Sequence, residues 1–173
     1  MIKSIPLLLL VVLFFASCES AKKKLAEEIA MGEKRLFSDS LKSLNVDESN
    51  NVLNNYLVYA DKYKDDSVSA NFLFKAADLA NGLHRPKESI AIFERLITSF
   101  PENRKSSSAL FMQAFIYETS MQDKEKAKEK YRKFIQKYPG HKLTPSAQAS
   151  LDQLNANLSD EELIRSFEAK GAK

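Results

Sequence analysis

The feature that most constrains the fold is an internal repeat in the middle of the chain. Residues 69–101 and 107–139 superpose without a gap when the sequence is shifted by 38 residues. Size and polarity are kept at eight paired positions. The pairs are Phe72/Leu110, Leu73/Phe111, Ala76/Ala114, Phe93/Tyr131, Leu96/Phe134, Ile97/Ile135, Phe100/Tyr138 and Pro101/Pro139. A period of this length is typical of solenoids, in which stacked repeats share a continuous core.

Each repeat is predicted to form two helices. In the second repeat, apolar residues recur at spacings of three and four along 110–117 and again along 127–138, which is the spacing of one helical face. Pro101 and Pro139 are expected to end the second helices, because proline cannot continue a helix. Thr144-Pro145 then fits the start of another helix, with threonine as its cap.

Weaker copies of the pattern flank the two full repeats. A leading helix is expected over 22–44, and the capping box at 159–162 predicts a short last helix. An earlier second helix is indicated by Tyr56, Tyr59, Ala60 and Tyr63, and a later first helix by Ala147, Leu151, Leu154 and Leu158. The chain is therefore predicted to be all-α, with about eight helices. The helical domain covers 25–173, with repeats at about 48–67 (half), 68–105, 106–144 and 145–169 (partial).

The repeats resemble the tetratricopeptide repeat. The likeness depends on Ala77, Phe93 and Pro101 in one unit and on Ala127, Tyr131 and Pro139 in the other. It implies a right-handed α-solenoid over about 48–158. The longer loop after Pro101 is similar to that of envelope proteins such as the lipoprotein component of the outer-membrane barrel-assembly machinery and the Tol-Pal coordinator. The ending LSDEELIRSFEAK resembles that of small tetratricopeptide lipoproteins of Bacteroidota.

The start of the chain has the pattern of a secretory signal peptide. Lys3 precedes an uncharged run over 5–16, which is too short for a membrane-spanning helix of about 20 residues. Small residues follow at the expected cleavage point, so 1–17 are predicted to be removed. The chain's single cysteine, Cys18, comes next, and a lone cysteine can form no disulfide within the chain.

Phe15-Ala16-Ser17-Cys18 resembles a bacterial lipobox, although Phe15 replaces the usual leucine. The resemblance implies that the thiol of Cys18 is alkylated with diacylglycerol and the new amino terminus is acylated. Residues 18–24 would then form a short tether. Glu19 in place of aspartate favours the outer membrane, and the mostly basic 19–24 favours its periplasmic side over the cell surface. The alternatives are an ordinary signal peptide and an uncleaved anchor.

The sequence offers no basis for an enzyme, a cofactor or a metal site. His84 and His141 have no further ligand at metal spacing and are expected to be solvated loop residues. No phosphate-binding glycine loop or nucleophile elbow is present. The net charge of +3 is too small to indicate nucleic-acid binding.

Two surfaces are candidates for partner binding. The family resemblance places Asn71, Phe74, Asp78, Met112 and Ile116 on the concave face, where they would suit an amphipathic helix or extended peptide. The alternative is that the three apolar residues pack in the core. Lys126, Lys130, Lys133 and Lys137 form a basic stripe that could meet an acidic partner or a phosphorylated glycolipid, or simply be a solvated helix face.

Three functions are therefore considered. The first is a lipid-anchored envelope scaffold that binds protein partners, for example as a subunit of an outer-membrane or cell-wall assembly complex. The second is a peptidoglycan- or glycan-binding accessory lipoprotein, which exposed aromatic side chains on the concave face would favour. The third is an enzyme, which would need clustered polar groups in a pocket.

Overall fold

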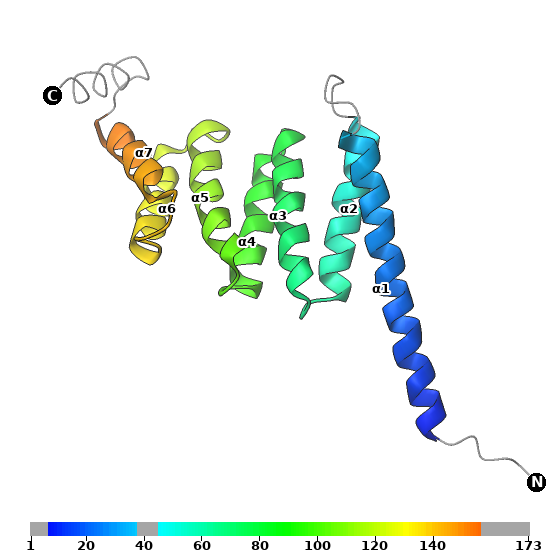
Figure 1. Ribbon diagram of the computed structural model, residues 1–173. Coiled ribbons are helices and arrows are strands. Elements are labelled where there is room, and N and C mark those ends of the chain that lie inside the picture. The colour runs from blue at the N-terminus through cyan, green and yellow to red at the C-terminus, as the bar shows by residue number, and fades with distance from the viewer. Residues whose placement is uncertain (1–6, 38–44, 157–173) are drawn as a thin grey trace, which may run out of the picture.

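The structure of the protein is a computed structural model that describes residues 7–37 and 45–156, without the side chains of 7–18. The described residues form seven helices and no strand, arranged side by side in one row (Figure 1). This confirms the predicted all-α solenoid; the expected last helix lies outside the described residues. The helices are α1 (Leu7–Phe37), α2 (Val46–Lys62), α3 (Ser67–Gly82), α4 (Pro86–Ser99), α5 (Arg104–Thr119), α6 (Lys124–Lys137) and α7 (Thr144–Ala156).

The turns between repeats are built in the same way three times. A hydroxyl near the start of a first helix donates to a backbone carbonyl six residues earlier, from Ser69 to Tyr63 at 2.7 Å and from Ser106 to Phe100 at 2.6 Å. Thr144, expected as a cap, is instead the first residue of α7 and donates to Tyr138 at 2.7 Å. The three turns therefore share one geometry, but they recur at offsets of 37 and then 38 residues, so the gapless offset of 38 expected over 69–139 holds for α4 and α6 and not for α3 and α5.

The helix ends agree with the local signals in the sequence. The side chains of Asn45, Asp66, Asn103 and Asp123 each accept a hydrogen bond from a backbone N–H of the helix that follows. These bonds satisfy amide groups that have no partner within the helix. Helices α4 and α6 end immediately before Phe100 and Tyr138, each of which precedes a proline.

The core consists of two apolar clusters. The first joins α1 to α4 with part of α5, and the second joins α5, α6 and α7. Phe93 and Leu96 in the first cluster, and Tyr131 and Phe134 in the second, are completely buried. These pairs occupy matching repeat positions, so the predicted inner stripe of the second helices is confirmed.

Helix α1 is longer than the predicted leading helix. Residues 18–24, expected to be a tether, lie within it, and Lys22 pairs with Asp66 at 3.0 Å. Gly32 allows α1 to approach α2 closely, because an added Cβ would lie 2.7 Å from a methyl carbon of Val52. The N-terminal half of α1 projects beyond the row of helices (Figure 1). Among the described residues, no helix is long and apolar enough to span a membrane.

Candidate partner-binding surface

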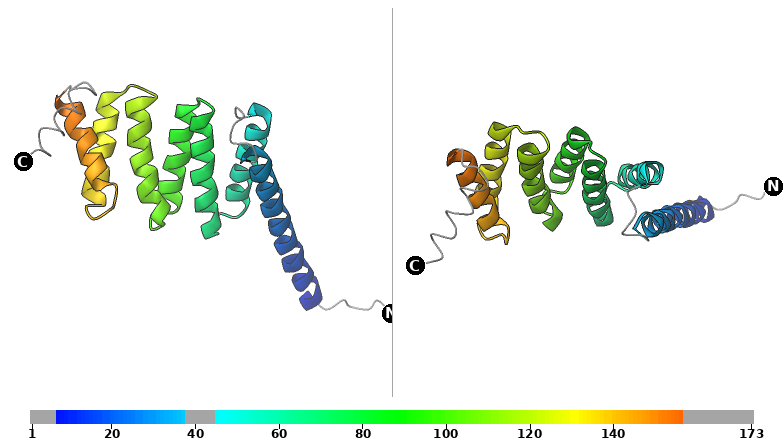
Figure 2. Two further views of the ribbon diagram at one scale, coloured as in Figure 1. Left: turned by 45° about the horizontal axis from the view of Figure 1, so that its top comes forward. Right: turned by 90° about the horizontal axis from the view of Figure 1, so that it is seen from above.

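The two helices of each pair lie on opposite sides of the array. Helices α1, α3, α5 and α7 follow one side and α2, α4 and α6 the other, as the view from above shows (Figure 2). We call the side formed by α1, α3, α5 and α7 the first-helix face. The predicted binding residues belong to α3 and α5, and therefore to helices of this face.

Four of the five predicted binding residues reach the surface. Asn71 and Asp78 are exposed, whereas Phe74 and Met112 are half-buried against the first core cluster. The ring of Phe74 packs edge-on against Phe93 with centroids 5.3 Å apart. These two apolar residues therefore combine core packing with a solvent-facing edge.

The prediction for Ile116 as a surface residue is wrong. Its side chain has an exposed fraction of 0% and belongs to the first core cluster, together with residues of α3 and α4. The alternative considered from the sequence, packing inside the array, holds for this residue. The expected offset of 38 residues is wrong for the first helices, because α3 and α5 match at an offset of 37; Ile116 therefore corresponds to the buried Leu79 and not to Asp78.

Asp78 has unusual electrostatic surroundings for an exposed residue. Burial of its carboxyl by neighbouring atoms raises its pKa to about 6, against an opposing attraction from the ammonium of Lys105. The residue as a whole is nevertheless exposed to solvent. No hydrogen bond or ion pair to Asp78 is formed by the described residues. Lys105 itself lies over the ring of Phe74, 4.5 Å from its centroid.

A pocket opens beside Asp78, between α1 and α3. It has a volume of about 410 Å³ and is lined by Glu33 and Phe37 from α1, Tyr56 from α2, and Lys75, Asp78 and Leu79 from α3. Of these, only Asp78 was predicted. No local signal could have found Glu33 or Tyr56, because the array alone brings α1 and α2 to α3.

The basic stripe of α6 is only partly free. Lys126 pairs with Asp123 at 3.2 Å and lies over the ring of Tyr117. Lys130 is largely buried and reaches Glu94 on α4 at 3.4 Å. Lys133 and Lys137 are exposed. Two of the four lysines therefore already have carboxylate partners, and a binding role for the stripe stays a prediction.

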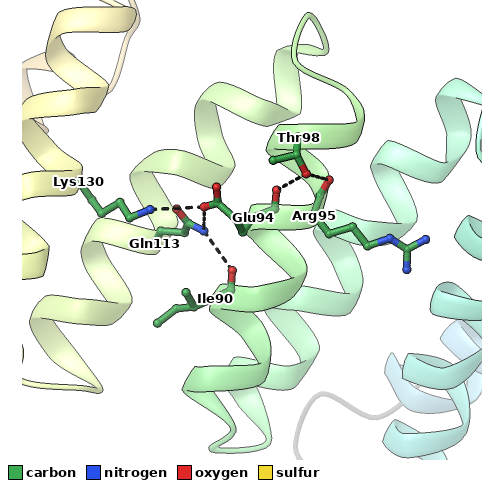
Figure 3. Close-up of polar contacts among 6 residues, drawn as sticks. All are labelled: Ile90, Glu94, Arg95, Thr98, Gln113 and Lys130. Carbon is green, nitrogen blue, oxygen red and sulfur yellow. Dashed lines mark hydrogen bonds and ion pairs between the residues drawn. The ribbon is translucent and has the colours of Figure 1, made fainter.

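Lys130 belongs to a polar cluster that links three helices (Figure 3). The amide of Gln113, buried on α5, donates to the carbonyl of Ile90 at 3.0 Å and to Glu94 at 2.9 Å. The hydrogen bond from Gln113, followed by the attraction of Lys130, keeps the pKa of Glu94 below its usual range. The cluster ties α4, α5 and α6 together through the Nε2 of Gln113 and the ammonium of Lys130, whereas the buried Oε1 of Gln113 has no hydrogen-bond partner among the described residues.

The two histidines do not form a site. His84 is exposed in the turn before α4, with a positive φ of 57°. His141, expected to be solvated, is half-buried against the ring of Phe134, with centroids 5.4 Å apart, and its Nδ1 accepts from the backbone N–H of Leu143. No three metal-ligating side chains come together among the described residues.

Comparison with known families identifies one repeat directly. Residues 108–141 match the family model described as tetratricopeptide repeat. The match covers most of α5, all of α6 and the turn that follows, which together are the second full repeat. No curated protein matches the chain.

The match and the fold define the class of protein. The chain is a helical solenoid of the tetratricopeptide type, and the match supports a tetratricopeptide-repeat protein. Repeats of this family are generally non-catalytic modules for protein–protein interaction. The surface described above is therefore best considered as a site for a protein partner.

Proposed function

We propose that the protein is a lipid-anchored scaffold of the bacterial cell envelope, which acts by binding protein partners and catalyses no reaction. The observation that carries this proposal is the first-helix face. There, Phe74 and Met112 are half-buried beside the exposed polar residues Asn71 and Asp78. An apolar strip with polar groups along it suits an amphipathic helix or an extended peptide.

The anchor is supported by the sequence of the first 18 residues. The lipobox-like Phe15-Ala16-Ser17-Cys18 provides the only cysteine. The side chains of these residues lie outside the described part of the structure. One acyl chain binds a membrane only marginally, so stable anchoring needs the two or three chains that lipoproteins receive. We place the protein at the outer membrane, facing the periplasm.

A capture experiment with a matched control tests the binding face. The tagged full chain is crosslinked in membranes, purified and analysed for bound proteins. Asn71→Arg puts a bulky cation on the first-helix face, and Asn51→Arg makes the same change at an exposed position of α2. We expect partner capture to be lost with the first variant and kept with the second. Equal capture by both variants would contradict binding through this face.

A glycan-binding role is the second candidate, and exposed aromatic side chains favour it. Phe37 on α1 and Phe115 on α5 are 61% and 42% exposed. Sedimentation with purified peptidoglycan tests this role directly. We expect the wild-type chain to stay in the supernatant; sedimentation that is lost in a Phe37→Ser, Phe115→Ser double variant would favour the glycan role.

A further inference from the structure

The pocket between α1 and α3 combines an apolar body with acidic groups. Phe37, Tyr56 and Leu79 supply the apolar lining, and Glu33 and Asp78 supply carboxylates. Its volume of about 410 Å³ lies at the small end of the range for ligand pockets. Such a space is large enough to admit a single long side chain of a partner.

The charge of Glu33 is already compensated within the protein. The hydroxyl of Tyr56 donates to its Oε1 at 2.6 Å, and the ammonium of Lys75 donates to the same oxygen at 2.7 Å. Both bonds join α1 to another helix of the array. We therefore assign Glu33 and Lys75 to holding the walls of the pocket in place.

Asp78 differs because none of the described residues gives it a hydrogen bond or an ion pair. Lys105 on α5 attracts it, but that ammonium lies over the ring of Phe74. Burial nevertheless raises the pKa of Asp78 to about 6, so the carboxylate lacks water on part of its surface at neutral pH. A partly desolvated carboxylate of this kind is stabilised by an added partner of opposite sign.

The matching position of the next repeat shows that a carboxylate is not required by the fold. Helices α3 and α5, with their caps and the turns before them, match at an offset of 37 residues, so Asp78 corresponds to Phe115 of the next repeat. Phe115 is an apolar residue that is 42% exposed on α5, whereas Asp78 lines an open pocket. An apolar side chain therefore fits the repeat at this position, and the carboxylate of Asp78 costs stability where it stands.

We propose that the α1–α3 pocket receives a lysine or arginine side chain of the protein partner. The aliphatic stem would lie along Phe37, Tyr56 and Leu79, and the terminal cation would bind the carboxylate of Asp78. Lysine and arginine side chains can each bury an apolar stem while the charged end stays at a polar group. An uncharged apolar side chain would fill the same space but leave Asp78 without a partner. This inference rests on the proposed function, because it names the chemistry of the partner segment.

Two matched peptides test the pocket with the full chain in detergent micelles. One is a capped pentapeptide with a central arginine between alanines; the other carries citrulline, which has the same shape without the charge. Binding is followed by NMR through the backbone amides of Phe37, Leu79 and Gly82, which line the pocket. We expect the arginine peptide to shift these amides and to bind about tenfold more tightly than the citrulline peptide, because a charge-assisted hydrogen bond is strong.

Three variants define the site. Asp78→Asn should reduce binding of the arginine peptide to the level of the citrulline peptide, whereas Asp65→Asn, at an exposed turn position, should leave it unchanged. Phe37→Ser should weaken the binding of both peptides, because it removes part of the apolar lining at an exposed position. Should Asp78→Asn fail to fold, the wild-type chain at pH 5 provides the same test, since Asp78 is then mostly protonated and the preference for arginine should disappear.

The outcomes separate this inference from the proposed function. Equal binding of the two peptides, or shifts confined to other helices, would overturn the pocket assignment. Partner capture that depends on Asn71 would still support the first-helix face in that case. If the preference for the arginine peptide and the Asn71-dependent partner capture are both absent, the scaffold proposal itself is contradicted.

Discussion

Replacing Phe134 with alanine tests whether the repeats share a common core. Phe134 on α6 has an exposed fraction of 0%. Its ring lies between Phe111 on α5, with centroids 5.6 Å apart, and the turn residue His141, at 5.4 Å. It therefore joins α5 and α6 to the turn that leads into α7.

The expected loss of stability follows from this burial. Truncating a buried phenylalanine to alanine costs about 3–5 kcal/mol, through lost transfer free energy and the cavity that remains. Full burial and ring neighbours on two sides place Phe134→Ala near the middle of this range, at about 4 kcal/mol. For a chain of this length, such a change lowers the melting temperature by roughly 8–16 °C.

The assay is thermal and urea unfolding followed by circular dichroism. Phe115→Ala is the matched control, because it removes the same ring from an adjacent helix at a position that is 42% exposed. We expect the control to melt within a few degrees of wild type. Since each repeat contacts mainly its neighbours, hydrogen exchange should increase in α5, α6 and α7 more than in α2 and α3. Identical melting of wild type and Phe134→Ala would refute the packing argument.

Four further predictions follow from the surface, the anchor and the charges. Met112→Glu should abolish partner capture while keeping the helical circular dichroism signal, because a half-buried position lets the carboxylate reach water; loss of helix content would instead assign Met112 to the core. Cys18→Ala should move the protein from the detergent to the aqueous phase of Triton X-114 and remove the acyl mass, with Ser20→Ala as control; unchanged partitioning and mass would contradict lipidation. Asp78→Asn should stabilise the fold by about 1 kcal/mol at pH 7, after allowing for screening by solvent, because the pKa of the aspartate rises from its ordinary 3.8 to about 6 on folding. The folded state then binds more protons between these values, so wild-type stability should increase as the pH falls from 6 to 4 and the advantage of the variant should disappear below pH 4. Tyr131→Phe should cost about 1 kcal/mol, since its hydroxyl donates to Glu118 at 2.6 Å, and the effects of Tyr131→Phe and Glu118→Gln on urea unfolding should not add.

The sequence was most informative where a local rule sets the structure. The apolar spacing predicted the buried stripe of Tyr131 and Phe134, and Pro101 and Pro139 marked the ends of α4 and α6. Helical periodicity and proline geometry act within a few residues, so a single sequence contains the whole signal. The 38-residue offset then extended these local predictions to a solenoid.

The candidate site was less predictable because its groups meet only in the array. Glu33, Tyr56 and Lys75 come from three helices, and no spacing along the chain connects them. The partner of Lys130 is Glu94, 36 residues away, so its pairing was hidden in the same way. Ile116 was misplaced because α3 and α5 match at an offset of 37 residues, whereas α4 and α6 match at 38.

Helix α1 connects the proposed anchor to the proposed pocket. Cys18 and Glu33 lie on one continuous helix, 15 residues apart, which corresponds to about 22 Å along its axis. This helix is held to the array by the ion pairs of Lys22 with Asp66 and of Arg35 with Glu48, by the buried Ile29, by the close approach of Gly32 to Val52, and by the bonds of Glu33 to α2 and α3. With Cys18 acylated, the pocket would lie at the membrane-proximal end of the solenoid, at a distance fixed by the helix. A partner segment bound there would be held close to the lipid surface. Inserting a flexible glycine–serine linker after Ser20 should therefore weaken the capture of partners that are themselves membrane-bound. The same insertion should leave binding of the arginine peptide unchanged.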